Sequence, residues 1–205
     1  MKTFKEYLEE DFKDGGLTIF DIDDTLFHTT AKIAVIKDGK KIKDLTNQEF
    51  NTYQLKDGES FDFSQFRDAV KFNTESKPIK KMLDKAKAIS RNAARTPLSK
   101  VIIVTARSNF DNKEIFLDTF RKHGFDMTKV RVERAGNISD VHDVAFKKVI
   151  IIRNYLRTKQ FSRVRLFDDS MANLKAFLKL RSEFPNVTFE AFFAKSDGTM
   201  TSVKS

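Results

Sequence analysis

Short apolar runs alternate with longer stretches of helical periodicity along most of this 205-residue chain. The apolar runs predict five strands, at residues 17–20, 101–104, 130–132, 164–167 and 187–193. Apolar positions that recur every three or four residues predict helices at residues 78–94, 112–124, 144–157 and 172–184. Strands that alternate with helices favour a Rossmann-like α/β fold, with an open, mostly parallel five-stranded sheet and helices on both faces.

Three segments lie outside this alternation. A Thr3 cap followed by an apolar stripe predicts an N-terminal helix. A small insertion, at about residues 28–95, contains a predicted hairpin around an Asp-Gly turn at residues 31–45. The polar and aromatic residues 47–72 that follow are expected to be irregular, except for a short helix at residues 63–72. The last dozen residues have the character of a loose tail. We therefore expect an N-terminal helix at residues 1–16 and one domain, with its cap-like insertion, at residues 17–205.

Composition narrows the chemistry. The chain has no Cys and only three His, none at the spacing of zinc ligands, so thiolate chemistry is excluded and a zinc site is not predicted. The net charge of +9 favours polyanionic partners, with Lys and Arg scattered along the chain, and fits nucleic acid or any phosphorylated substrate. The sequence shows neither a membrane span nor a signal core, so we expect a cytoplasmic protein without a membrane partner.

Polar clusters follow three of the predicted strands directly. They read Asp21-Ile-Asp23-Asp24-Thr25 after the first strand, Thr105-Ala106-Arg107 after the second and Asp168-Asp169 after the fourth. Ligands of open α/β sheets bind beyond the carboxyl ends of the strands. The three clusters therefore predict one site at that end of the sheet.

Each residue type in these clusters suits a step of phosphoryl transfer. A carboxylate such as Asp21 can attack phosphorus and form an aspartyl-phosphate. Asp23, two residues on, can protonate the leaving oxygen and later deprotonate the attacking water. The hydroxyls of Thr25 and Thr105 and the guanidinium fork of Arg107 suit phosphoryl oxygens, although a strand-to-helix turn with a surface Arg would show the same residues.

A basic residue and a cation complete the predicted site. Lys147 and Lys148, at the start of the helix at 144–157, can both offset charge between nucleophile and substrate. We favour Lys147, because Phe146 before it is expected to pack inward. Carboxylates crowded at strand ends fit Mg²⁺. The predicted ligands are Asp21, Asp168 or Asp169, and the backbone carbonyl of Asp23, with Asn173 orienting an acid from outside the ligand shell.

In this order the clusters resemble the four motifs of the haloacid dehalogenase (HAD) superfamily. The matching segments are Ile19–Leu26 with its D-x-D-x-T pattern, Val101–Thr105, Lys147 and Leu166–Ser170, which together cover residues 17–193. The resemblance implies a Rossmann-like core, Mg²⁺ and an aspartyl-phosphate intermediate. An acid at the position of Asp23 marks the phosphatases and phosphotransferases of that superfamily rather than its dehalogenases.

A shorter resemblance concerns the first ten residues. Met1–Glu10 is similar to the capsid-targeting sequence of internal head proteins in tailed bacteriophages, which is clipped after a pattern that Leu8-Glu9-Glu10 matches. An amphipathic first helix that packs on the core explains the same residues equally well.

The interpretation that accounts for most residues is a Mg²⁺-dependent phosphomonoesterase, with nucleotides or nucleic-acid ends among its plausible substrates. Sugar phosphates and phosphoproteins stay open, because motif residues do not define a substrate. A phosphotransferase would use the same residues. The alternative from another class is a non-enzymatic, DNA-associated phage virion protein that binds through its charge.

Overall fold

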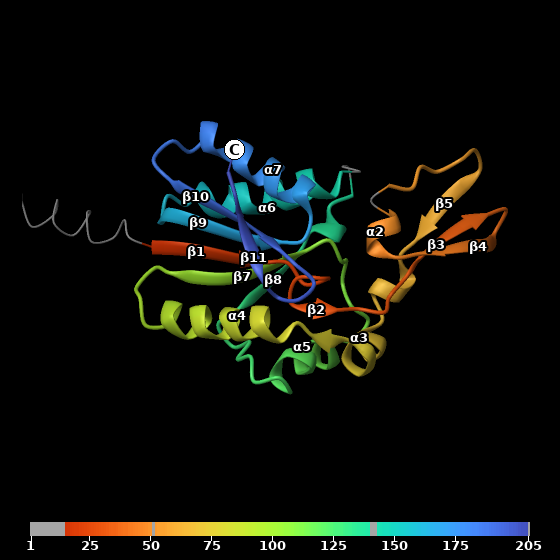
Figure 1. Cartoon of the computed structure of the whole chain (residues 1–205), viewed down its shortest axis with the longest axis horizontal. Helices are drawn as coiled ribbons and strands as arrows, with labels where there is room; N and C mark the ends of the chain where they lie inside the picture. The colour runs from red at the N-terminus through yellow and green to blue at the C-terminus, as the bar shows by residue number, and fades with distance from the viewer. Residues whose placement is uncertain (1–14, 51, 140–142, 205) are drawn as a thin grey trace, which may run out of the picture.

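A six-stranded sheet forms the centre of the protein (Figure 1). The computed structural model describes residues 15–50, 52–139 and 143–204. The strand order is β11-β10-β9-β1-β7-β8, and all neighbours are parallel except β10 and β11. The strands are β1 (Gly15–Phe20), β7 (Lys100–Thr105), β8 (Arg131–Arg134), β9 (Phe161–Asp168), β10 (Thr188–Ala194) and β11 (Met200–Val203).

The Rossmann-like α/β prediction is confirmed, with one strand more than expected. All five predicted strands are present, and β9 extends beyond its predicted bounds at both ends. The expectation of a loose C-terminal tail is wrong. A turn at Asp197 and Gly198 reverses the chain, and β11 pairs with β10 from Met200 to Val203. The predicted N-terminal helix falls on residues 1–14, outside the described residues, and Gly15 and Gly16 begin β1 rather than end a helix.

Helices cover both faces of the sheet (Figure 1), as the alternation predicts. On one face, α3, α4 and α5 pack with β2 and β6 in a core rich in Phe. On the other face, α6 and α7 enclose a core of mainly aliphatic side chains. The elements are β2 (Phe27–His28), α3 (Ala69–Glu75), β6 (Lys77–Pro78), α4 (Lys80–Ala93), α5 (Lys113–Arg121), α6 (Val144–Leu156) and α7 (Met171–Leu178), which η3 (Lys179–Ser182) continues.

The insertion between β1 and β7 contains a small sheet of its own. The predicted hairpin is confirmed as β3 (Ile33–Lys37) and β4 (Lys40–Leu45), and β5 (Glu59–Asp62) pairs with the other side of β3. Its core holds Ala31, Ile33, Val35, Leu45 and Phe66. Its other elements are α2 (Asn47–Phe50) and η1 (Ser64–Phe66). Since α3 and α4 pack on the central sheet, the part that stands apart from it is residues 31–66, which we call the insertion from here on.

Two details of this region differ from the sequence expectation. The segment after the hairpin was expected to be irregular but supplies β5. The helix expected at residues 63–72 is divided into η1 and α3, because the Asp68 side chain caps a new helix by accepting the Lys71 N–H.

Three phenylalanines form a stack across the strands that carry the predicted acids. Phe20 on β1 stacks with Phe167 on β9 at 4.7 Å between ring centroids, and Phe167 stacks with Phe192 on β10 at 4.8 Å. Offset stacking of this kind adds to the burial of the rings. The stack fixes the register of β1 and β9 immediately before Asp21 and Asp168.

Within the described residues, no helix combines the length and apolarity needed to cross a bilayer.

Candidate functional site

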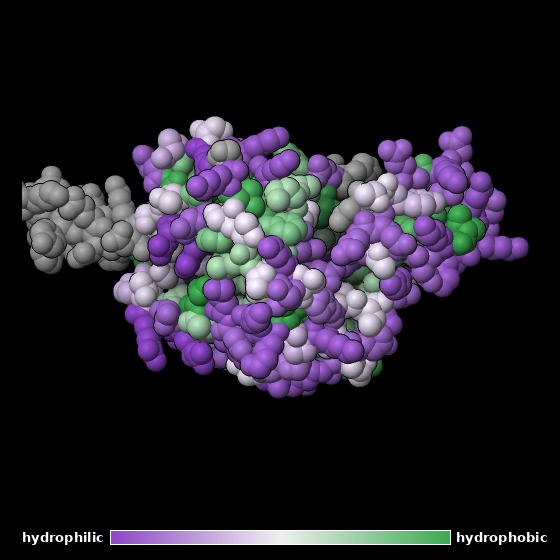
Figure 2. All heavy atoms as spheres, viewed as in Figure 1, coloured by the Kyte–Doolittle hydropathy of each residue, from purple (hydrophilic) through white to green (hydrophobic). Residues whose placement is uncertain are grey.

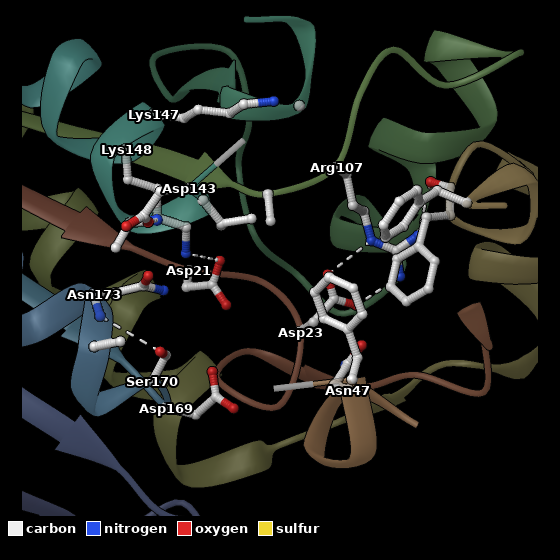
Figure 3. A pocket seen from close by; sticks show the side chains of 18 of the residues that line it. Asp21, Asp23, Asn47, Arg107, Asp143, Lys147, Lys148, Asp169, Ser170 and Asn173 are labelled. Carbon is white, nitrogen blue, oxygen red and sulfur yellow. Dashed lines mark hydrogen bonds and ion pairs between the residues drawn. The ribbon is translucent and has the colours of Figure 1, made fainter. Parts of the chain in front are cut away.

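A pocket of about 460 Å³ opens at the carboxyl ends of β1, β7 and β9, where the polar clusters were predicted to meet. The insertion forms the wall opposite the sheet (Figure 3). From the core the pocket is lined by Asp21, Asp23, Ala106, Arg107, Ser108, Gly136, Asp143, Val144, Ala145, Lys147, Lys148, Asp169, Ser170, Ala172 and Asn173. From the insertion it is lined by Ile33, Asn47, Phe50, Phe63 and Phe66.

Three carboxylates gather at the floor of this pocket. Asp21 follows β1 and is nearly buried, and Asp168 ends β9 with no exposed surface. Asp169 is half-buried beside them. One oxygen of each carboxylate lies within 4.8 Å of the others. The parallel pairing of β1 with β9 brings these acids together, and the Asp21 N–H donates to the Phe167 carbonyl at 3.0 Å.

Lys148, rather than Lys147, neutralises this cluster. Its ammonium donates to Asp21 Oδ1 at 2.7 Å and to Asp168 Oδ2 at 2.8 Å, and the residue is almost fully buried. The expectation that Phe146 packs inward is wrong, since 47% of that residue is exposed. The preference for Lys147 depended on that expectation. Lys147 lines the pocket farther from the acids (Figure 3).

The phase of α6 explains this difference. The helix buries Ala145, Val149, Ile152 and Leu156. Lys148 lies three residues after Ala145 and four before Ile152, so it shares their face. The spacing of these apolar residues therefore points to Lys148 from the sequence alone, whereas the single residue Phe146 does not.

Crowding and burial change the acidity of the cluster. Burial raises the pKa of Asp21 to about 7, against the opposing effect of Lys148 and with a further rise from Asp168. Burial also raises the pKa of Asp169 to about 8, with Asp21 and Asp168 adding to the shift. Burial alone would lower the pKa of Lys148, but Asp168 and Asp21 outweigh it and raise the pKa. One ammonium is therefore too little positive charge for three carboxylates near neutral pH.

This donor set fits a hard divalent cation. Mg²⁺ binds carboxylate oxygens and retains several waters, so two or three acids suffice. Asp21 and Asp169 line the pocket, and Asp168 lies beneath them. A cation held by these oxygens would supply the positive charge that Lys148 leaves missing.

Asn173 and Ser170 hold the deepest acid in place. The Asn173 amide donates to both carboxylate oxygens of Asp168, at 2.9 and 3.1 Å, and the Ser170 N–H donates to Oδ1 at 2.9 Å. Ser170 also caps α7, since its hydroxyl accepts the Asn173 N–H. The start of α7 therefore fixes Asp168, as expected for Asn173.

Asp23 lies across the pocket and is bound by Arg107 (Figure 3). Arg107 donates through Nε to Asp23 Oδ2 at 2.9 Å and through NH2 to Oδ1 at 2.6 Å. Its NH1 donates to the Phe66 carbonyl at 3.0 Å. The guanidinium carbon lies 4.6 to 5.4 Å from the ring centroids of Phe66, Phe72 and Phe110. The fork expected to bind phosphate is thus occupied by an acid of the protein.

The two predicted threonines lie below the pocket surface. Thr105 is fully buried, and its hydroxyl accepts the Arg107 N–H at 3.2 Å, which shapes the loop after β7. Thr25 is also fully buried, and its hydroxyl has no hydrogen-bond partner among the described residues. Neither residue lines the pocket. Ala106, Arg107 and Ser108 do, with Gly136 packed so closely that a Cβ there would lie 2.5 Å from the Ala106 oxygen.

The insertion contributes residues that were not singled out from the sequence. Phe50, Phe63 and Phe66 form an aromatic wall, with 5.5 Å between the ring centroids of Phe50 and Phe63. Asn47 lines the same wall and donates to Asp24 Oδ2 at 3.2 Å. Asn47 and Phe50 belong to the stretch expected to be irregular, and Phe63 and Phe66 to the helix expected at residues 63–72. Only the high Phe content of residues 47–72 sets them apart in the sequence.

Comparison with known proteins bears on the fold alone. A solved structure with the same arrangement is that of the HAD domain of the effector protein Lem4 from Legionella pneumophila. The two superpose with a TM-score of 0.54 over 91% of this chain and 90% of that one, at 11% sequence identity. The fold is HAD-like. The sequence matches no protein-family model, and no curated protein is significantly similar to it.

The structure predicts opposite outcomes for the two neighbouring lysines. Lys148→Met leaves two buried carboxylates without a cation, so we expect the free energy of unfolding in EDTA at neutral pH to fall by about 3 kcal/mol or more. Lys147→Met removes a partly exposed ammonium and should change the free energy of unfolding by less than about 0.5 kcal/mol. Urea unfolding of both variants measures the difference, and equal losses would contradict the assignment.

The raised pKa values of Asp21 and Asp169 predict that cation binding releases protons. At pH 6 the raised pKa values keep protons on Asp21 and Asp169, and Mg²⁺ must displace them. Above pH 8.5 both carboxyl groups are ionised and Mg²⁺ has no protons to displace. The apparent Mg²⁺ affinity should therefore rise by about tenfold or more between pH 6 and pH 8.5.

Isothermal titration in two buffers of different ionisation enthalpy measures both affinity and proton release. Asp169→Asn, which removes the most exposed acid, should weaken binding and reduce the number of protons released. An affinity that is the same at both pH values would show that the cluster does not bind the ion as expected.

Proposed function

We propose that the protein is a Mg²⁺-dependent phosphomonoesterase that acts through an aspartyl-phosphate on Asp21. The observation that carries the proposal is the buried contact of Lys148 with Asp21 and Asp168 beneath an open pocket. A structural role does not require a buried ammonium to hold two acids at the floor of a cavity, because such a pair contributes little net stability. The HAD-like fold supports the same conclusion by analogy.

In the first step, Asp21 acts as the nucleophile. One carboxylate oxygen forms a bond to phosphorus while the bond from phosphorus to the ester oxygen breaks. Lys148 donates to Oδ1 of Asp21 and so orients the carboxylate, with the other oxygen left to attack. A cation held by Asp21, Asp168 and Asp169 would offset negative charge on the phosphoryl oxygens. The product of this step is an acyl phosphate on Asp21 and a free alcohol.

Asp23 is the proposed proton donor and acceptor. In the first step it gives a proton to the leaving oxygen, and in the second it takes one from the water that attacks phosphorus and regenerates Asp21. Its two hydrogen bonds from Arg107 hold it across the pocket from the nucleophile. We therefore assign Arg107 as a positioning residue for Asp23 in place of the phosphate-binding role expected from the sequence.

Thr105 has an indirect role in this proposal. By accepting the Arg107 N–H it shapes the loop after β7, so that the N–H groups of Ala106 and Ser108 can bind phosphoryl oxygens in the pocket. Thr25 is fully buried and does not line the pocket, so we assign it no contact with the substrate.

The aromatic wall favours a substrate with a planar group, which supports nucleotides or nucleic-acid ends over sugar phosphates. Phe63 is 43% exposed, although a ring of that size is usually covered. Bases stack on exposed aromatic rings without much regard to sequence. Phe50 and Phe63 on the insertion therefore lie where a base attached to the reacting phosphate can stack.

The first test is hydrolysis of an aryl phosphate by the purified chain with Mg²⁺, with EDTA, and as the Asp21→Asn variant. We expect phosphate release that requires Mg²⁺ and falls by at least about a thousandfold in the variant. Trapping of a covalent phosphoryl group on the wild type alone would identify the intermediate. Activity retained by Asp21→Asn would sink the mechanism.

A second test concerns the aromatic wall. Phe63→Ala should raise the KM for a nucleoside monophosphate by about five- to thirtyfold, because stacking on a ring contributes about 1–2 kcal/mol. The same variant should leave the KM for glycerol phosphate unchanged, and Phe63→Tyr should behave as the wild type. Equal changes for both substrates would show that Phe63 shapes the pocket without recognising a base.

A further inference from the structure

The positive charge of the chain is concentrated in one segment. Residues 77–100 contain eight Lys or Arg and a single acid, Asp84, so they carry +7 of the net +9. The rest of the chain is close to neutral. This segment consists of α4 and its two flanks. The expectation that Lys and Arg are scattered evenly along the chain is therefore wrong.

The cations lie on the outward face of α4. Met82, Leu83 and Ala86 face the core, and the opposite side carries the basic residues. Lys80 and Lys87 share Asp84, at 2.8 and 2.7 Å. Among the described residues, Lys81, Lys85, Arg91 and Arg95 take part in no ion pair. Hydrophilic residues cover the lower part of the view in Figure 2, where Figure 1 places α4 and α5.

This arrangement opposes the stability of the helix itself. The first turn of α4 contains no acid and begins with Lys80 and Lys81, although acids are favoured at that end. Lys81 and Lys85 are four residues apart, as are Lys87 and Arg91, and like charges at this spacing destabilise a helix. The charge of the face is thus not explained by a need of the helix.

We propose that the outward face of α4 binds the phosphate backbone of a nucleic acid. The helix of 14 residues is about 21 Å long and presents a row of cations to a polymer that carries one charge per ~1.7 Å. The far end continues onto Lys100 and Arg163, which flank β1 on neighbouring strands. Contacts from Lys and Arg to phosphate carry no sequence information, so we expect the binding to be independent of sequence.

Other polyanionic partners fit this face less well. A protein interface has apolar or aromatic anchors at its centre, and a helix on a membrane inserts large apolar side chains. None of the exposed large hydrophobic residues among the described residues lies on α4. A face on which cations outnumber a single acid, Asp84, is suited to phosphates.

The surface is separate from the pocket, so its test is independent of the proposed function. The probe is a fluorescent DNA duplex of about 20 base pairs with hydroxyl ends, in EDTA, so that no terminal phosphate reaches the acids. Anisotropy is measured for the wild type and for the triple variant Lys81→Gln, Lys85→Gln and Arg91→Gln. The matched control is Lys37→Gln, Lys40→Gln and Lys56→Gln, which removes equal charge from exposed positions of the insertion.

We expect the α4 triple variant to weaken binding at least about tenfold and to lower the salt slope of log K by about 2 to 3, while the control binds nearly as the wild type. Because like charges are removed from the helix, the α4 variant should unfold at the same temperature as the wild type or higher, which separates lost binding from lost folding. Equal losses in both variants would reduce the effect to overall charge and overturn the proposal. It is equally overturned if the wild type binds vesicles of anionic lipid but not the duplex.

Discussion

The contact of Lys148 with Asp21 and Asp168 is the constraint on which the rest of the site depends. Three carboxylates within 4.8 Å of one another repel, and two of them are buried. Without a buried cation the ends of β1 and β9 could not meet as they do, because each uncompensated charge costs several kcal/mol. Lys148 makes the arrangement possible but leaves it short of positive charge. That deficit favours a cation at the cluster, and such a cation would offset the negative charge of a phosphoryl group.

The fold supplies this contact through the order of its strands. β1 lies between β7 and β9, so three loops far apart in the sequence meet at one edge. The Phe stack fixes the register of β1 against β9, and α6 brings Lys148 over the junction with the apolar face that packs on the sheet. Side chains held by strands and helices in this way are positioned more accurately than side chains on loops.

The sequence predicts the sheet, the hairpin and the acidic cluster because each depends on local periodicity or on strand ends. It fails where a contact is non-local. Nothing local shows that Arg107 is bound to Asp23 and enclosed by rings from η1, α3 and the loop before α5. The choice of Lys147 failed because one large residue, Phe146, was weighed above the spacing of four smaller ones. The strand β11 was missed because its pairing with β10 depends on a turn at Asp197 and on a neighbour, more than on its own apolarity.

Lys and Arg side chains occur in two different settings in the protein, buried beside acids and exposed on α4. Lys148 and Arg107 are buried and saturated by acids, so they orient groups of the protein and offer little to a ligand in solution. The cations of α4 are exposed and largely unpaired, so their charge acts outward and is weakened by salt. α4 runs back along the sheet from β6, which pairs with the strand that follows the Asp21 loop. A polymer on α4 therefore lies along the same domain whose pocket is suited to a phosphate. If both proposals hold, the outer cations raise the local concentration of substrate and the inner ones position the reacting acids, which separates affinity from turnover within one domain.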